Sequence, residues 1–428
     1  MRIVQVNKFH YVKGGAERYY LDLSTALRGR GHRVDHLAMA HPDNLPGGPG
    51  DLFVSEVDYR SRASTTSRIR QGLRAIYNRE AARGARSLAR RDGPAIAHLH
   101  NIYHQLSPSV VRAFAAEQVP MVQTLHDYKL VCPAYLLMTE GAICERCRGG
   151  HYFEAVRHRC LLESRAASAV AAVEAYFHGW VRTYDAIARF LCPSRFLLEK
   201  VASFGVARDR LVHLPYFVPA AEYRVTDPPR EKLAIYVGRL SREKGIATLL
   251  EAMARLPQGR LRLHVLGDGP LRPMLEARAR QLASGQVVFL GYRSGDALHD
   301  EIRRGDFTIV PSEWFENLPF AILESFALGR PVAGARIGGI PELVIDGETG
   351  RLFESGDADS LAEALLWMTG PEADVVAMGR RARRRIEAEH DPSAHLDRLT
   401  ALYAELLGQS SRAHRPAVSV TARSESRT

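Results

Sequence analysis

The sequence predicts an α/β fold of two doubly wound domains that face each other across a cleft. Three observations support this expectation. The chain has 428 residues, which is more than one hydrophobic core usually organises. In both halves, short β-branched runs alternate with amphipathic helical stretches, as in parallel sheets covered by helices on both faces. A polar, proline-rich stretch over residues 219–230 separates the halves and is the predicted linker.

Short apolar runs mark the strands of the first half, residues 1–218. A helical pattern, "GAERYYLDLSTALRGRG", follows the first run and is stopped by Gly31. A cysteine-rich insertion at about residues 128–163 interrupts the alternation. The predicted strands are "MRIVQV", "HRVDHLAMA", "AIAHLHN", "PMVQTLHD", "RFLCPS" and "LVHLPYFV".

The second half, residues 231–390, repeats the alternation. We expect a C-terminal helix over residues 391–407 to pack back across the domains. Residues 408–428 have almost no apolar bulk, so a disordered tail is predicted there. Ligands of doubly wound sheets bind beyond the carboxyl ends of the strands, which makes the cleft the expected site. The predicted strands are "KLAIYVGRL", "LRLHVLGDG", "VVFLGY", "FTIVPS" and "PVAGARIGG".

Composition and charge narrow the class of protein. Apolar residues make up 46% of the chain and charged residues 25%, as in soluble globular proteins. No apolar run reaches the length of a membrane span, and the N-terminal residues lack the layout of a signal peptide. We therefore expect a cytoplasmic protein. The net charge is +10, and residues 60–91 contain ten arginines against one glutamate, which suggests an anionic partner.

The segment "FTIVPSEWFENLPFAILESFALGRPV" carries the strongest site pattern. A buried strand gives way to a loop, and a helix is expected to begin at Pro319 with Asn317 or Leu318 as its cap. The free N–H groups of residues 318–321 would then point into the cleft. The N-terminus of a helix is an anion site, so this one suits a diphosphate.

Two glutamates flank that helix start, Glu316 before the helix and Glu324 one to two turns inside it. Carboxylates cannot bind phosphate, but they accept hydrogen bonds from sugar hydroxyls. An ordinary capped helix with solvated glutamates is the alternative.

Two loops at strand ends are candidate phosphate contacts. In "VGRLSREKG", Arg239 and Lys244 can reach a diphosphate, the arginine with a forked contact and the lysine as a point charge. In "KGGAER", Gly14 and Gly15 let the backbone approach a phosphate or sugar closely. A solvated basic loop and a simple tight turn are the alternatives.

A histidine, His126 in "TLHDYKLVCP", lies at another strand end of the first half. Its position favours a polar contact to a sugar beside the reacting centre. Lone histidines are more often structural, and that alternative stays open.

Four motifs stand in a recognisable order: "GGAE", "GRLSREKG", the E-x7-E pair in "ENLPFAILE", and "GGIPELVIDGETGRLF". Together they resemble the retaining family 4 glycosyltransferases, whose two Rossmann-like domains form the GT-B fold. The resemblance spans residues 1 to about 405. It implies that Glu316 contacts the donor sugar, Glu324 the nucleotide ribose, and Arg239 with Lys244 the diphosphate. It also assigns Gly14 and Gly15 to the diphosphate and His126 to the sugar.

The resemblance implies a mechanism as well. The donor would be a UDP- or GDP-linked sugar, whose leaving-group charge Arg239, Lys244 and helix dipoles would stabilise. We therefore assign catalytic roles to Glu316, His126, Arg239 and Lys244. Catalysis would need no metal cofactor. Retention could proceed by front-face attack, because no side chain stands out as a nucleophile.

The expected reaction is hexosyl transfer to a lipid-linked or polysaccharide acceptor, in cell-envelope or exopolysaccharide synthesis. Within residues 60–91, four apolar residues stand at helical spacing: Ile69, Leu73, Ile76 and Tyr77. This pattern favours a basic amphipathic helix that lies on anionic lipid at the inner face of the membrane. A solvated helix is the alternative, and no recognition motif supports nucleic acid. Two other functions stay open: transfer to a small soluble acceptor, and a catalytically inactive nucleotide-sugar-binding regulatory protein.

Four cysteines fall within the insertion: Cys132, Cys144, Cys147 and Cys160. A central C-x2-C with two flanking cysteines is ligand spacing for a tetrahedral, structural zinc. His151 and His158 are substitutes if one cysteine is not a ligand. Reduced thiols and redox disulfides are the alternatives. Cys192, in "FLCPS", is expected to be a buried strand cysteine.

Overall fold

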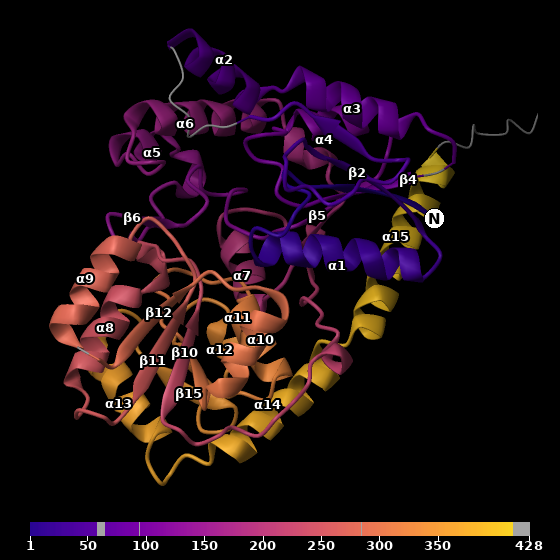
Figure 1. Ribbon diagram of the computed structural model, residues 1–428. Coiled ribbons are helices and arrows are strands. Elements are labelled where there is room, and N and C mark those ends of the chain that lie inside the picture. The colour runs from indigo at the N-terminus through magenta and orange to yellow at the C-terminus, as the bar shows by residue number, and fades with distance from the viewer. Residues whose placement is uncertain (58–64, 94, 284, 414–428) are drawn as a thin grey trace, which may run out of the picture.

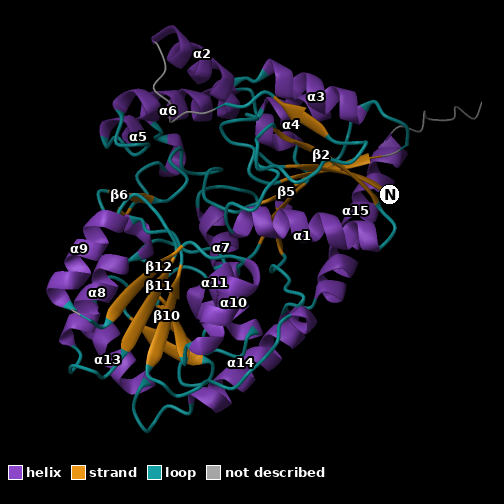
Figure 2. Ribbon diagram, viewed as in Figure 1, coloured by secondary structure: helices purple, strands orange, loops and turns teal. Residues whose placement is uncertain are grey.

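The computed structural model describes residues 1–57, 65–93, 95–283 and 285–413. Two α/β domains face each other, each built on a parallel sheet with helices on both faces (Figure 1, Figure 2). The predicted fold class is confirmed. Among the described helices, none is both long enough and apolar enough to cross a bilayer.

A seven-stranded sheet forms the centre of the first domain, in the order β3-β2-β1-β4-β5-β8-β9. β1 and β4 are buried along their whole length, as expected for parallel strands covered on both faces. Cys192 is a buried strand residue, as predicted. The strands are β1 (Arg2–Val6), β2 (Arg33–Met39), β3 (Leu52–Val54), β4 (Ala95–Leu99), β5 (Met121–Thr124), β8 (Arg189–Cys192) and β9 (Leu211–His213).

Helices cover both faces of this sheet. The helices of this domain are α1 (Gly15–Gly29), α2 (Thr65–Ile76), α3 (Arg79–Ala89), α4 (Ser109–Ala116), α6 (Arg165–Trp180) and α7 (Arg195–Ser203), of which α2 packs against α6. The cysteine-rich insertion follows β5. It contains a small antiparallel hairpin and two short helices: β6 (Met138–Thr139), β7 (Ala142–Ile143), η1 (Arg148–Gly150) and α5 (Phe153–Arg157).

The second domain has a six-stranded parallel sheet in the order β12-β11-β10-β13-β14-β15. The strands are β10 (Leu233–Val237), β11 (Arg262–Leu266), β12 (Val287–Gly291), β13 (Phe307–Val310), β14 (Val332–Ala335) and β15 (Gly350–Phe353). The helices are α8 (Ile246–Arg255), α9 (Arg272–Leu282), α10 (Gly295–Arg304), α11 (Phe320–Ala327), α12 (Ile340–Leu343), α13 (Ala358–Met368) and α14 (Val375–Glu389).

The last helix, α15 (Pro392–Ala413), runs from the second domain back onto the first (Figure 1). The Tyr403 hydroxyl lies 2.6 Å from Nδ1 of His98 in β4. The Tyr19 hydroxyl of α1 lies 2.9 Å from Nε2 of His395. These buried contacts join the end of the chain to the first sheet.

The end of α15 corrects one prediction. Residues 408–413 are helical, whereas the sequence predicted a disordered tail from residue 408. Buried Tyr403 and Leu406 anchor the preceding turns, and once a helix is anchored each further residue adds a backbone hydrogen bond at small cost. The remainder of the predicted tail, residues 414–428, lies outside the described residues.

The arginine-rich stretch forms two helices, α2 and α3, and α2 contains three of the four apolar positions of the expected basic helix: Ile69, Leu73 and Ile76. The break falls at Asn78, whose side chain accepts hydrogen bonds from the N–H groups of Glu80 and Ala81 and so caps α3. Tyr77 therefore lies between the helices. Residues 58–64 of this stretch lie outside the described residues.

Candidate functional site

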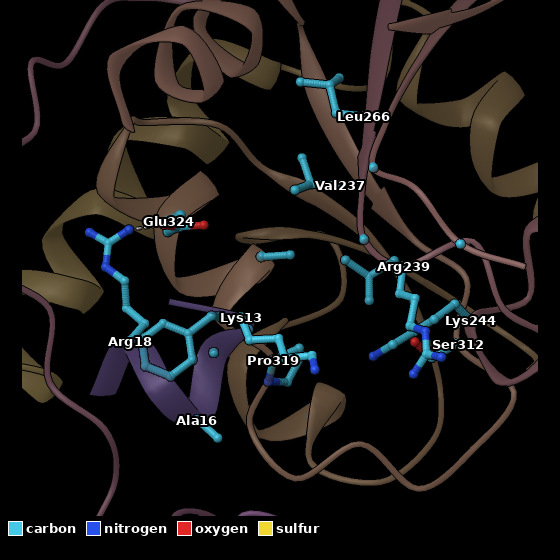
Figure 3. Close-up of a pocket in the computed structure, with 18 of the residues that line it drawn as sticks. Lys13, Ala16, Arg18, Val237, Arg239, Lys244, Leu266, Ser312, Pro319 and Glu324 are labelled. Carbon is cyan, nitrogen blue, oxygen red and sulfur yellow. Dashed lines mark hydrogen bonds and ion pairs between the residues drawn. The ribbon is translucent and has the colours of Figure 1, made fainter. Parts of the chain in front are cut away.

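A cavity of about 1230 Å³ lies between the two domains. Its walls come from the loops after β1 and β5 in the first domain and after β10, β11, β12 and β13 in the second. All of these loops follow carboxyl ends of parallel strands, where ligands of such folds bind. Figure 3 shows Arg18 and Glu324 on one side of it, and Arg239, Lys244 and Ser312 on the other.

Glu316 is buried at the edge of this cavity and carries an ion pair. Its Oε1 lies 2.7 Å from the ammonium of Lys244 and accepts a 2.6 Å hydrogen bond from the Ser312 hydroxyl. Burial alone would raise the pKa of Glu316, but the charge and hydrogen bond of Lys244, together with the side chains of Ser312 and Trp314, outweigh burial and lower it. The carboxylate is therefore ionised and fixed in position.

Arg239 and Lys244 differ in whether the side chain has a partner within the described residues. The Arg239 side chain is exposed at the cavity and has no hydrogen bond or ion pair to any described residue. Lys244 is half-buried and held by Glu316. The predicted pair of basic residues thus lies on one wall, with one cation free to meet an anion and one already attached to a carboxylate.

The start of α11 corrects a second prediction. Pro319 is the N-cap residue, and neither Asn317 nor Leu318 caps the helix with its side chain. The Asn317 amide instead donates a 3.4 Å hydrogen bond to the Leu125 carbonyl across the domain interface. Leu318, Pro319 and the first residues of α11 line the cavity, so the helix N-terminus faces it as predicted.

Glu324 reaches the cavity from inside α11 and binds Arg18 of α1. The two side chains form a 2.9 Å ion pair between the domains, with side chains 9% and 27% exposed respectively. Arg18 also donates to the Tyr223 hydroxyl at 3.1 Å and pairs with Asp22 at 3.2 Å. Arg18 was not among the predicted site residues, although it belongs to the quoted "KGGAER" motif, because sequence alone does not show that α1 faces α11.

The two glycines of that motif have different surroundings. At Gly15, a Cβ atom would lie 2.6 Å from the Phe320 ring of α11, closer than real Cβ contacts. At Gly14, the nearest atom would be a Glu17 carboxylate oxygen at 3.7 Å. Both glycines line the cavity, but Gly15 is also required for the close approach of α1 to α11.

His126 lines the cavity, yet both of its ring nitrogens bind other residues of the chain. Nδ1 lies 2.7 Å from the Tyr216 hydroxyl, and Nε2 lies 2.9 Å from Nδ1 of His100. Burial lowers the pKa of His126 to about 3, so the ring is neutral. The predicted polar contact to a sugar would therefore require one of these hydrogen bonds to break.

The Arg18–Glu324 pair leads to a pH prediction. Burial raises the pKa of Glu324, the charge of Arg18 lowers it, and the charge of Asp22 raises it. If the carboxylate binds the donor, protonation weakens binding at low pH. Arg18→Gln removes the lowering charge, so the acidic limb of the donor-binding profile should move to higher pH. Donor binding titrated across pH by calorimetry would measure this.

Asp22→Asn is the matched control for this prediction. It removes the charge that raises the Glu324 pKa, so it should move the acidic limb to lower pH. An acidic limb that stays in place in both variants would show that Glu324 does not control donor binding.

Two family models match the chain. "Glycosyltransferase Family 4" covers residues 13–222, and "Glycosyl transferases group 1" covers residues 223–385. With two Rossmann-like sheets facing each other across a cavity, the fold is GT-B. The matches support a glycosyltransferase of the family 4 type.

Curated relatives are glycosyltransferases too. Sulfoquinovosyl transferase SQD2 of Arabidopsis thaliana is 35% identical over 163 residues, covering 37% of this chain and 31% of the relative. Alpha-D-kanosaminyltransferase of Streptomyces kanamyceticus is 31% identical, covering 43% and 47%. The amylovoran biosynthesis glycosyltransferase AmsK of Erwinia amylovora is 32% identical, covering 36% and 40%. The chain thus spans about a third to a half of the length of these relatives.

Solved structures share the fold across nearly the whole chain. Sucrose-phosphate synthase from Thermosynechococcus elongatus has a TM-score of 0.70 at 19% identity, covering 95% of this chain and 99% of that one. Anabaena Alr3699/HepE, solved with UDP and glucose, has a TM-score of 0.67 at 15% identity, covering 95% and 100%. At such identities the likeness establishes the fold alone.

Proposed function

We propose that the protein is a retaining glycosyltransferase that moves a sugar from a nucleoside diphosphate sugar to a lipid-linked or polysaccharide acceptor. One observation carries the proposal. A single interdomain cavity brings together the ionised Glu316, its partner Lys244, the free Arg239 and the N-terminus of α11. Anabaena Alr3699/HepE, which shares this fold, has been solved with UDP and with UDP-glucose, which supports a nucleotide-sugar donor.

Charge stabilisation would be the main catalytic contribution. As the sugar leaves, negative charge develops on the diphosphate, and Arg239, Lys244 and the N–H groups at the start of α11 supply positive charge to it. These groups would stabilise the leaving group without a metal ion. Glu316, already held by Lys244 and Ser312, suits a hydrogen bond from a sugar hydroxyl. Front-face attack, with the acceptor proton passing to the leaving phosphate, then accounts for retention.

A donor panel tests the proposal. Purified protein would be mixed with UDP-glucose, UDP-galactose, UDP-N-acetylglucosamine or GDP-mannose, with and without membrane lipid extract, and released nucleoside diphosphate would be followed. Turnover of one donor with retained anomeric configuration in the product, lost in Arg239→Ala, is the expected result. Saturable binding of a donor without turnover in any extract would favour the regulatory function. Absence of binding to every donor would overturn the proposal.

The acceptor side carries a candidate membrane surface. Helices α2, α5 and α6 lie together at the outer end of the first domain (Figure 1). They expose large apolar side chains: Leu73, Phe153, Val173, Tyr176 and Trp180, the last 83% exposed. The exposed Arg70 lies on α2 as well. Exposed aromatics beside arginines suit the interface of an anionic bilayer, where a lipid-linked acceptor would be held.

Trp180→Ser should weaken binding to vesicles that contain anionic lipid, because an exposed indole inserts at the headgroup level. We expect an affinity roughly tenfold lower, from the loss of about 1.5 kcal/mol of apolar burial. Co-sedimentation with phosphatidylglycerol vesicles would measure it. Met274→Ser, at an exposed apolar position of α9 in the second domain, is the matched control. Equal binding by both variants and wild type would exclude α6 from the membrane contact.

A small soluble acceptor is the second candidate. One relative carries a name that indicates such an acceptor: the N-acetyl-alpha-D-glucosaminyl L-malate synthase of Bacillus anthracis. Turnover with a lipid-free, low-molecular-weight extract, unchanged by Trp180→Ser, would favour this candidate over the lipid-linked acceptor.

A further inference from the structure

The four cysteines of the insertion line one small cavity, separate from the interdomain site. Cys132 lies in the loop after β5, Cys144 directly after β7, Cys147 directly before η1, and Cys160 beyond the end of α5. The volume of the cavity is about 10 Å³, close to the smallest volume that holds a single water molecule. Apolar side chains complete its wall: Ala134, Leu137, Met138 and Ala155. The fifth cysteine, Cys192, lies in β8 and does not line it.

The start of the insertion joins the core of the first domain through buried Tyr128, Val131 and Leu137. Beyond Leu137, the buried apolar side chains other than cysteine are Met138 and Ala155. The hairpin of the insertion consists of two two-residue strands, and α5 has five residues, which is too short for either element to be stable alone. Large apolar side chains that could form a core are exposed: Ile143 is 38% exposed, Phe153 52% and Leu162 58%. Cys132 and Cys147 are buried instead, each 8% exposed. The thiols thus stand where a small unit of this size would have its core.

We propose that Cys132, Cys144, Cys147 and Cys160 bind one structural Zn²⁺. Small units without a sufficient apolar core commonly depend on a metal, and four thiolates at C-x2-C spacing form a closed tetrahedral zinc site. No imidazole or carboxylate lines the cavity among the described residues, so the donor set is all sulfur, which zinc binds well. Cys160 now donates a weak hydrogen bond to Thr139 Oγ1 at 3.4 Å.

The four sulfur atoms are too far apart to bind one metal ion without a movement of their side chains. Among the described residues, the set whose ligand atoms all lie within 4.8 Å of one another is His10, His36 and Asp51. Its members already have hydrogen-bond partners: His36 binds Asp51 at 2.9 Å, and His10 binds the Tyr20 hydroxyl at 2.8 Å. The four cysteines share a cavity without that spacing, so binding would draw their side chains inward by rotation about Cα–Cβ.

The zinc site would brace the donor side of the cleft. The β6–β7 turn reaches the second domain, where Arg242 donates a 3.2 Å hydrogen bond to the Glu140 carbonyl. A Cβ at Gly141 would overlap the Arg242 guanidinium, so the turn and this side chain are in close contact. Arg242 lies in the same short helix as Lys244, η5 (Arg242–Lys244). The bracing of the donor side rests on the proposed function, whereas the zinc site itself does not.

A second contact leads from the insertion to the Glu316 loop. Lys200 of α7 pairs with Glu145, between the two central cysteines, at 2.6 Å. The same ammonium lies 4.5 Å from the centre of the Phe315 ring. Loosening the insertion would therefore disturb both loops that carry the donor-binding residues.

Metal content of the full chain tests the proposal directly. Protein purified without chelators or a histidine tag is expected to hold about one zinc per chain by elemental analysis. Cys144→Ser and Cys147→Ser should lose most of it, and Cys192→Ser, which removes a buried thiol outside the cavity, should keep it. Replacing zinc by Co²⁺ should give strong thiolate-to-metal charge-transfer absorption that fades with each cysteine removed.

Two outcomes would overturn the zinc site: a metal-free protein that takes up neither Zn²⁺ nor Co²⁺ after reduction, or zinc retained in full by both variants. If the variants fail to fold, metal removal from wild type replaces them, and limited proteolysis at residues 128–163 should then increase.

Donor affinity is measured separately. If zinc binds as expected but its removal leaves donor affinity unchanged, only the bracing of the cleft is overturned. If the protein binds zinc but no donor, only the proposed function is overturned.

Discussion

Glu316→Gln should lower kcat by about 10²–10³-fold, the usual loss when one positioned electrostatic group is removed from an active site. The substitution keeps the shape of the side chain but removes its charge and its ion pair with Lys244. The freed lysine would no longer be fixed between the carboxylate and the diphosphate. Steady-state release of nucleoside diphosphate, with circular dichroism to verify folding, would measure the effect.

Glu313→Gln is the control on the same loop. Glu313 accepts a hydrogen bond from Thr248 and does not line the cavity, so its substitution should change kcat by less than about threefold. Comparable loss in both variants would mean that the loop as a whole, rather than the Glu316 carboxylate, governs the rate.

Lys129→Met should destabilise the protein by about 3–5 kcal/mol, because it leaves a buried carboxylate without its partner. The Lys129 ammonium lies 2.5 Å from Glu174 Oε2 of α6 and 3.2 Å from the Pro133 carbonyl. The two charged side chains are 2% and 1% exposed. Thermal unfolding should show Tm lower by roughly 10 °C.

Two variants separate the buried charge from general effects of losing a basic residue. Lys129→Met combined with Glu174→Leu should recover most of the stability, since an apolar pair needs no partner. Arg208→Met, which breaks the exposed pair with Glu199, should leave Tm nearly unchanged, because solvent screens an exposed ion pair. A double variant no more stable than Lys129→Met would contradict this explanation.

The sequence predicted most of the strands in both sheets but missed one short edge strand of each. β3 and β15 were not predicted, since "LFV" and "GRLF" are too short to show a period. β1, β10 and β13 were clear because central parallel strands are continuous apolar runs. Edge strands are defined by their neighbours in the sheet, and neighbours are a tertiary property.

For the candidate site, the sequence placed residues on loops but could not pair them. Glu316 and Lys244 were predicted separately, and only the structure shows that they form one ion pair. Arg18 was not predicted, because its partner Glu324 is 306 residues away along the chain. His126 was expected to contact a sugar, whereas His100 and Tyr216 take both of its ring nitrogens.

By itself, the sequence determined which strand ends and helix starts carry charge, because alternating apolar runs fix where parallel strands end and therefore which residues face the cleft. Only the tertiary structure decided which of those charges are free and which are neutralised. Arg239 meets no described partner, whereas Lys244 and Glu324 each bind an opposite charge from another loop or domain. The physical reason is that ion pairs depend on distances of a few ångströms between distant segments, which are set when the two domains pack together.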